Sequence, residues 1–204
     1  CESHKPLEML ADNLHRQLPL DIRLRDDMTL DNYFPAANEQ VVSDLKRFID
    51  SPATNGVVIC AEPGLGKTHL LQALTQQIRE VSREALYLPM KDWYVFGADA
   101  LDGLERYDLI CIDDVDQVAG DSSWEEGLFH LLNRIWANHH QVALSVSAPV
   151  STDSGWLLPD LISRLNWGLV CRLQEMDDEQ KLGALSMRAQ RRGLELPVET
   201  ARFM

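Results

Sequence analysis

Five short apolar runs alternate with amphipathic stretches along the chain. The runs cover residues 56–60, 84–89, 107–114, 141–147 and 168–173, and turn-forming or charged residues bound each of them. A continuous apolar run is typical of a strand buried on both faces, because such a strand has no solvent-facing side on which polar residues would alternate. The pattern therefore predicts five buried strands.

Between these runs, apolar residues recur at the spacing of a helix. They predict helices over 38–50, 67–80 and 121–140, and Ser122 and Glu125 have capping-box spacing at the start of the third. Strands that alternate with helices indicate a parallel sheet covered on both faces. After residue 174 the pattern is helical, with a break at "RGLELP" and a last helix expected to begin near Pro197.

Composition narrows the functional classes. The 204 residues fit one domain, or one core with a small appendage. There is no apolar run of about 18 residues, so we expect no membrane span. Nineteen basic and 32 acidic residues give a net charge of −13, which disfavours a surface that grips the DNA backbone. A protein that works beside DNA through protein partners remains compatible with this charge.

The cysteines indicate a reducing environment. Cys60, Cys111 and Cys171 lie inside apolar runs, and no CxxC pair occurs among the four cysteines of the chain. We interpret them as buried thiols rather than metal ligands or disulfides. The expected location is therefore the cytoplasm.

The stretch "AEPGLGKTH" at 61–69 follows the first apolar run and opens a predicted helix. It matches the phosphate-binding loop G-x-x-x-x-G-K-[ST], except that Ala61 replaces the first glycine. Gly64 and Gly66 allow backbone N–H groups to converge on phosphate oxygens. Lys67 would reach the β- and γ-phosphates, and the Thr68 hydroxyl would ligate Mg²⁺. The alternative is a chance Gly-Lys-Thr turn.

A second polar group ends the third run, "DLICIDD". Asp113 would hold Mg²⁺ and Asp114 is a candidate for orienting water, although a polar strand end is the simpler alternative. The fourth run ends with Ser145 and Ser147, neither of which brings charge to a γ-phosphate. The sequence thus favours a nucleotide binder over a vigorous hydrolase.

Longer segments carry a family resemblance. They are "TLDNYFP", "GLGKTHLLQA", "LICIDDVDQVAGDSSWEEGLFHLLNRI", "LPDLISRLNWGL" and "RAQRRGLELP". They resemble the AAA+ core of the bacterial replication initiator DnaA, and more closely the Hda-type regulatory inactivators of DnaA. The resemblance implies an α/β fold: an AAA+ P-loop three-layer domain with a five-stranded parallel sheet plus a partial helical lid. It divides the chain into an N-terminal arm (1–28), a nucleotide-binding core (29–174) and the start of the lid (175–204).

The resemblance also assigns residues. Phe34 and Asn38 would contact the base. The full set expected to bind nucleotide is Phe34, Asn38, Pro63, Gly64, Leu65, Gly66, Lys67, Thr68 and His69, although His69 itself is more typical of a packing or capping residue. The family's second sensor arginine is expected beyond residue 204.

Two further motifs concern partners. Arg164 in "LISRLNWG" aligns with the family's arginine finger, which enters a neighbour's nucleotide site; the alternative is an ordinary surface salt bridge. Gln17, Leu18 and Leu20 in "HRQLPLDI" resemble a peptide that binds the sliding clamp; the alternative is an amphipathic arm packed on the core. Trp124 and Trp167 are the tryptophans that we expect on a partner surface.

Together these features imply a negative regulator of replication initiation. It would hold ADP or ATP with Mg²⁺, attach to the DNA-loaded sliding clamp and present Arg164 to ATP bound on DnaA. Its own hydrolysis would be weak, direct DNA binding would be slight, and it would be capable of nucleotide-dependent self-association. The alternatives are a DnaA-like initiator or helicase-loader ATPase that binds DNA, and an autonomous P-loop enzyme.

Overall fold

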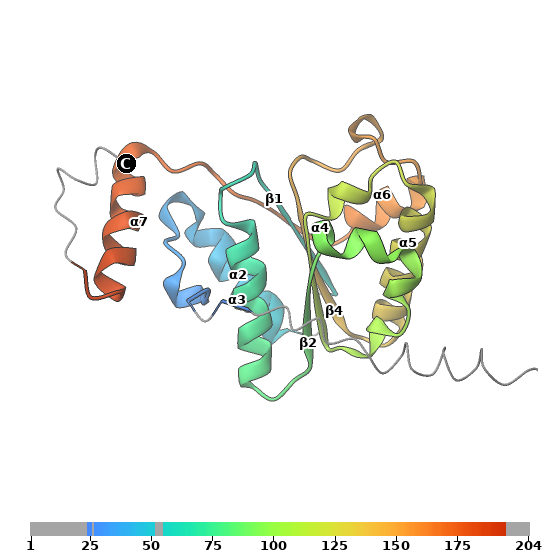
Figure 1. The fold of residues 1–204 in the computed structure, drawn as a ribbon, viewed down its shortest axis with the longest axis horizontal. Coiled ribbons are helices and arrows are strands. Elements are labelled where there is room, and N and C mark those ends of the chain that lie inside the picture. Colours follow the sequence, from blue (N-terminus) through green and yellow to red (C-terminus); the bar gives the residue numbers. More distant parts are fainter. Residues whose placement is uncertain (1–23, 26, 52–54, 195–204) are drawn as a thin grey trace, which may run out of the picture.

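The computed structural model describes residues 24–25, 27–51 and 55–194. Five strands form a single parallel sheet in the order β2-β3-β4-β1-β5 (Figure 1). They are β1 (Gly56–Cys60), β2 (Ala85–Pro89), β3 (Leu109–Asp113), β4 (Gln141–Val146) and β5 (Leu169–Arg172). Each lies within one of the predicted runs. The predicted five-stranded parallel sheet is confirmed.

Helices cover both faces of the sheet (Figure 1). On one face lie α2 (Glu39–Asp50) and α3 (Lys67–Glu80). On the other lie α4 (Met90–Trp93), α5 (Ser122–Ala137) and α6 (Pro159–Leu165). Helix α7 (Asp178–Arg191), which we call the lid helix, stands away from the sheet, beside the residues that precede α2 (Figure 1). The layers are therefore those expected of the three-layer domain.

The strand sequences explain why two cores form. Along β3, Leu109 and Cys111 belong to the core under α2 and α3, whereas Ile110 and Ile112 belong to the core under α4, α5 and α6. Successive side chains of a strand point to opposite faces, so an unbroken apolar run serves both cores. All five residues of β3 are buried.

The cysteines of the described part behave as buried thiols. Cys60, Cys111 and Cys171 are free and buried on β1, β3 and β5. Burial raises the pKa of the Cys111 thiol to about 12 and that of Cys171 to about 11. Both are poor nucleophiles for that reason, since the thiolate is the reactive form.

The capping box expected at Ser122 and Glu125 is wrong. Asp121 caps α5 instead, because its carboxylate accepts from the backbone N–H groups of Ser123 and Trp124. Glu125 is fully buried and accepts the backbone N–H groups of Gly120 and Leu157, neither of which is the backbone N–H of Ser122 that a capping box would require.

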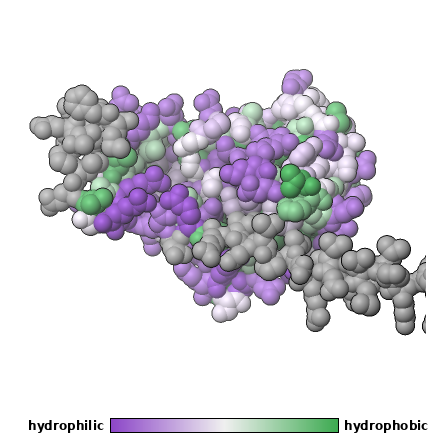
Figure 2. Space-filling view, viewed as in Figure 1, coloured by the Kyte–Doolittle hydropathy of each residue, from purple (hydrophilic) through white to green (hydrophobic). Residues whose placement is uncertain are grey.

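The surface is mostly hydrophilic in the view of Figure 2, with a small apolar patch over the region of α4. Within the described ranges, no helix has both the length and the apolar character needed to cross a membrane. Exposed large apolar side chains in this part include Tyr94, Val95 and Phe96, directly after α4.

Candidate functional site

The phosphate loop joins β1 to α3 and requires glycine at two positions. Gly64 and Gly66 have φ values of +88° and +95°, in the left-handed region that favours glycine. Gly66 is the N-cap of α3, and no side chain of the described residues caps that end. The first N–H groups of a 14-residue helix therefore face the loop, where the partial positive charge of the helix favours an anion.

We expect Gly66→Ala to destabilise the protein more than Gly64→Ala. A positive φ costs an L-residue about 1–2 kcal/mol at either position. At Gly66 the new Cβ would also lie 2.9 Å from Cε2 of Tyr33, whereas at Gly64 nothing lies within 4 Å. Urea unfolding of both variants measures the difference. Equal losses of stability in the two variants would show that the Tyr33 ring moves aside without a cost in free energy.

Lys67 and Thr68 lie directly behind the glycines. The Lys67 side chain is buried; its Nζ donates to the Ala61 carbonyl at 2.7 Å and lies 3.8 Å from Oδ1 of Asp114. The Thr68 hydroxyl donates to Oδ2 of Asp113 at 2.7 Å. The structure thus brings together the loop and the acidic strand end, which are 45 residues apart in the sequence.

Three hydroxyl groups hold the Asp113 carboxylate. Besides Thr68, the Tyr87 hydroxyl donates to Oδ2 at 2.7 Å and the Ser145 hydroxyl donates to Oδ1 at 2.5 Å. Burial and the nearby Asp113 carboxylate raise the pKa of Tyr87 far above its usual value. Ser145 also accepts the Asp114 backbone N–H at 2.7 Å. Ser145 therefore orients the acidic pair, and Tyr87 is a supporting residue that sequence reasoning missed.

The same groups fit a nucleotide-bound Mg²⁺. A carboxylate and a hydroxyl side by side are oxygen ligands of the kind Mg²⁺ prefers, with phosphate oxygens and water completing the octahedron. Among the described residues no group of three or more His, Cys, Asp or Glu could hold a metal ion. A cation at Thr68 and Asp113 would thus depend on the phosphates for its remaining ligands.

A cavity of about 880 Å³ opens beside the loop, between residues 32–38 and the lid helix α7. Its volume lies within the usual range for a small-molecule site, about 300–1,000 Å³. Six of the nine residues expected to bind nucleotide line it: Phe34, Asn38, Gly64, Leu65, Gly66 and His69. Pro63 belongs to the adjoining loop, and Arg188 of α7 adds a lid cation to the lining.

Asn38 and Phe34 both contact the lid side of this cavity. The Asn38 amide nitrogen donates to the Gln174 carbonyl at 3.0 Å, and its oxygen accepts the Gln174 N–H at 2.7 Å. The Asn38 amide therefore fixes the segment leading to α7. A Cβ added at Gly183 of α7 would lie 3.0 Å from the Phe34 ring, so this glycine permits close packing of the lid. Neither pairing has a local sequence signal.

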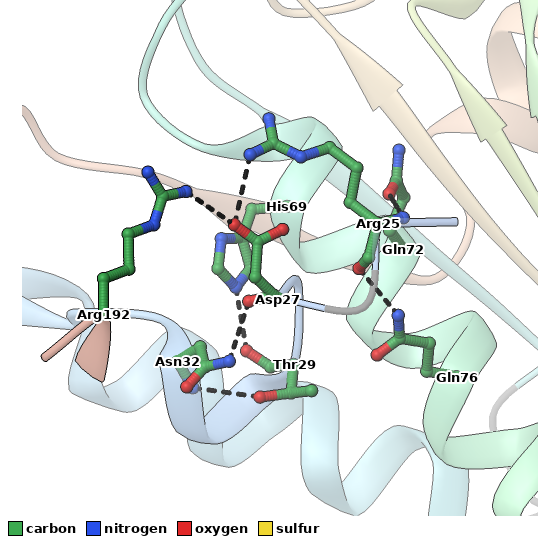
Figure 3. Close-up of polar contacts among 8 residues, drawn as sticks. All are labelled: Arg25, Asp27, Thr29, Asn32, His69, Gln72, Gln76 and Arg192. Atoms are coloured by element: carbon green, nitrogen blue, oxygen red, sulfur yellow. Dashed lines mark hydrogen bonds and ion pairs between the residues drawn. The ribbon is translucent and has the colours of Figure 1, made fainter. Parts of the chain in front are cut away.

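An N-terminal strap, residues 24–25 and 27–32, ties the phosphate-loop helix to the end of the lid (Figure 3). Gln72 and Gln76 of α3 bind the backbone of Arg25 at 3.1 and 2.8 Å. Arg192, just after α7, lies 3.2 Å from Oδ2 of Asp27. The strap therefore connects the two sides of the cavity.

His69 anchors the middle of the strap. Its Nε2 lies 2.8 Å from the Thr29 carbonyl, and burial lowers the pKa of the ring. A neutral His69 that donates from Nε2 satisfies this contact. The packing role expected for His69 agrees with this geometry.

Arg164 lies on the other side of the sheet from the cavity. It belongs to α6, which packs on α5, whereas the cavity lies on the side of α2 and α7 (Figure 1). Arg164 is half-buried, and its side chain makes no hydrogen bond or ion pair with any residue that the structure describes. The alternative of an ordinary salt bridge therefore finds no partner in that part of the chain.

The two tryptophans expected on a partner surface differ. Trp167 follows α6 and is 69% exposed, as expected. Trp124 is only 3% exposed, so the expectation for it is wrong. It lies in the first turn of α5, where its ring packs in the core and stacks on Tyr94 at 5.8 Å. Gln17, Leu18 and Leu20 lie outside the described residues.

Sequence comparison finds similarity to a known family and to one protein over most of the chain. The bacterial DnaA ATPase domain family matches residues 97–172. An uncharacterized protein of Haemophilus influenzae is 36% identical over 192 residues, which cover 94% of this chain and 83% of that protein. The matched segment contains the acidic strand end and Arg164, although it begins after the phosphate loop.

Solved structures share the fold at lower identity. Domain III of the Thermotoga maritima initiator DnaA has a TM-score of 0.77 at 23% identity, covering 88% of this chain and 80% of that one. AMPPCP-bound DnaA from Aquifex aeolicus has a TM-score of 0.76 at 21% identity (89% and 60% covered). The DnaC helicase loader has 0.62 at 14% (73% and 98% covered). The chain therefore shares the fold of the AAA+ ATPase domain of DnaA, and its residues 97–172 match the bacterial DnaA ATPase domain family.

Proposed function

We propose that this protein is a nucleotide-bound regulator that stimulates hydrolysis of ATP held by the initiator DnaA, the role of Hda-type inactivators. The observation that carries the proposal is the placement of Arg164. Its guanidinium lies over a ring of α5, on the sheet face opposite the protein's own nucleotide cavity, and no carboxylate within the described part of the chain pairs with it. An arginine in this position can serve a neighbour's site and not its own.

The proposed ligand of the cavity is ADP or ATP. The Aquifex aeolicus DnaA structure was solved with AMPPCP, an adenine nucleotide analogue. Here the N-terminus of α3 would receive the phosphates, Lys67 would leave the Ala61 carbonyl to bind them, and Thr68 and Asp113 would hold Mg²⁺. The bound magnesium ion would neutralise phosphate charge.

The same geometry argues for weak hydrolysis by the protein alone. Asp114 could orient water, and burial together with Asp113 raises the pKa of its carboxyl. An arginine finger contributes about 10³–10⁵ in rate in related phosphoryl-transfer enzymes. Because Arg164 faces away from the cavity of its own chain, that contribution requires a second molecule.

Lys67→Ala is expected to weaken ADP and ATP binding about 10- to 100-fold, since a hydrogen bond to a charged group contributes about 1.5–3 kcal/mol. Isothermal titration calorimetry of the full chain measures the change. Lys46→Ala, which removes an exposed lysine of α2, is the matched control. Unchanged affinity in the Lys67 variant would contradict the assignment of the loop.

The proposed attachment is to the sliding clamp through Gln17, Leu18 and Leu20. It rests on the sequence "HRQLPLDI" alone, and the net charge of −13 favours recruitment by a protein over direct contact with DNA. Self-association is compatible with the same finger geometry. We place this activity in the cytoplasm, where DnaA and the clamp act.

The test uses DnaA loaded with labelled ATP and the clamp loaded on DNA. Adding the full chain should speed hydrolysis of the bound label, and either omission of the clamp or Gln17→Ala should remove the effect. If the labelled ATP is hydrolysed equally well without the clamp, the proposed attachment to the clamp is wrong. If the chain leaves DnaA-bound ATP intact yet steadily hydrolyses free ATP, it is an autonomous enzyme.

A helicase-loader or initiator role is the second candidate, favoured by the shared fold of the DnaC helicase loader. Such a role requires contact with DNA or helicase. Fluorescence anisotropy with labelled single- and double-stranded DNA at moderate salt separates the two, because a regulator with this charge should bind neither strongly. Tight binding would favour the second candidate.

A further inference from the structure

Three aromatic rings surround the guanidinium of Arg164. Its central carbon lies 4.9 Å from the ring centroid of Trp136, 5.3 Å from that of Trp167 and 6.0 Å from that of Phe129. Cations are attracted to aromatic faces within about 6 Å. Phe129 and Trp136 come from α5, seven residues apart, and Trp167 comes from the residues after α6. We call these three rings the aromatic cage.

The Arg164 guanidinium contacts aromatic rings and forms no ion pair with the carboxylate on its own helix. Asp160 lies four residues earlier on α6, the spacing at which an acidic and a basic side chain stabilise a helix. No ion pair joins these two side chains, although both line one hollow of about 540 Å³. Ring contacts leave the N–H donors of a guanidinium available, whereas a carboxylate would occupy them.

Trp167 is the most exposed member of the cage. The residue is 69% exposed, yet its ring meets that of Trp136 edge to face, at 5.7 Å and 71°. Its backbone N–H also donates to the Arg164 carbonyl at 3.0 Å. The cage is thus assembled next to Arg164 at the surface, where a partner can approach.

We propose that Trp167, together with Trp136, is a positioning residue that holds the Arg164 side chain in place before it meets a partner's triphosphate. The proposal rests on the finger function proposed above and adds the residues that prepare the finger. A free arginine side chain carries about 2 kcal/mol of rotamer entropy, so restraining it in advance raises the stimulated rate about ten- to thirty-fold.

The first test needs no partner. In the full chain with labelled arginine, the side-chain protons of Arg164 should show ring-current shifts, assigned by their loss in Arg164→Ala. Trp167→Ala should move these signals toward free-arginine positions, and Trp167→Phe should restore most of the shift. Arg164 signals that are unmoved in Trp167→Ala would overturn the cage whatever the function of the finger.

The second test separates positioning from docking. In the assay with DnaA-bound ATP, Trp167→Ala should lower the rate at saturating protein about ten- to thirty-fold, while the half-saturating concentration stays the same. Trp167→Phe should recover most of the rate. Val81→Ala, which removes another exposed apolar side chain at the end of α3, should match wild type.

Each contrary outcome has a distinct meaning. A Trp167→Ala variant that changes only the half-saturating concentration would make Trp167 a docking contact and overturn the positioning role. If Arg164→Ala itself stimulates as wild type does, the finger function fails while the spectroscopic test of the cage stands. Thermal unfolding checks that the variants fold, as expected for a residue this exposed.

Discussion

Arg164→Ala is expected to reduce the stimulated hydrolysis of DnaA-bound ATP to the rate of DnaA alone. The loss should reach about 10³-fold or more, because a finger arginine neutralises charge that develops on the transferred phosphoryl group. The guanidinium lies against aromatic rings and forms no ion pair in the described part of the chain, so its charge is available to the partner. Single-turnover hydrolysis of labelled ATP on DnaA, with the clamp on DNA, measures the effect.

Two companion variants sharpen this result. Arg164→Lys keeps the charge but loses the planar fork that binds phosphate oxygens in pairs, so it should recover only a small part of the rate. Arg172→Ala removes an exposed arginine from β5, the neighbouring edge strand, and should stimulate as wild type does. Nucleotide affinity of the protein itself should be unchanged in Arg164→Ala, since α6 lies away from the cavity. Full stimulation by Arg164→Ala would end the finger assignment.

The parts of the molecule that could be predicted depend on neighbours in sequence. The run 56–60 followed by Gly64, Gly66 and Lys67 is a strand, a turn and a helix start, and each is encoded within a few residues. The parallel sheet follows from the alternation of such units. These local signals are enough to identify the fold, whereas the binding of nucleotide at this loop stays a prediction.

The parts that could not be predicted join distant segments. Asn38 pairs with Gln174 across 136 positions, and Arg192 reaches Asp27 across 165. Such pairs leave no periodic trace, because each residue is an ordinary polar side chain in its own neighbourhood. The expected exposure of Trp124 was wrong for a related reason. Exposure depends on tertiary packing, and here the ring of Tyr94 stacks on that of Trp124.

Glu125 is the strongest example of a residue whose role only the fold reveals. Its carboxylate accepts the backbone N–H of Gly120 at 2.8 Å, that of Leu157 at 2.9 and 3.0 Å, and that of Leu158 at 2.7 Å. It is fully buried. It therefore joins the loop before α5 to the segment that leads into α6, the helix of Arg164.

Glu125→Ala should destabilise the protein by about 3–5 kcal/mol, because three backbone donors lose the fully buried carboxylate that accepts from them, and each unsatisfied group costs about 1–3 kcal/mol before any water enters. Glu125→Gln keeps one acceptor oxygen but turns an NH₂ group toward N–H donors, so we expect a smaller loss. Glu126→Ala, which removes the exposed neighbour in sequence, should change stability by less than about 0.5 kcal/mol. Urea unfolding, with the same denaturant dependence for each variant, gives the three changes in the free energy of unfolding.

The contact between Glu125 and the segment that leads into α6 also gives a functional prediction. If Glu125 sets the entry of α6, then Glu125→Gln should lower the stimulation of DnaA-bound ATP hydrolysis while ADP affinity stays at the wild-type value, because the cavity is lined from the other side of the sheet. If Glu125→Gln is destabilised yet stimulates hydrolysis as wild type does, Glu125 contributes to stability alone and does not position Arg164. An unchanged unfolding midpoint in Glu125→Ala would show that water enters the vacated space and accepts from the three N–H donors in place of the carboxylate.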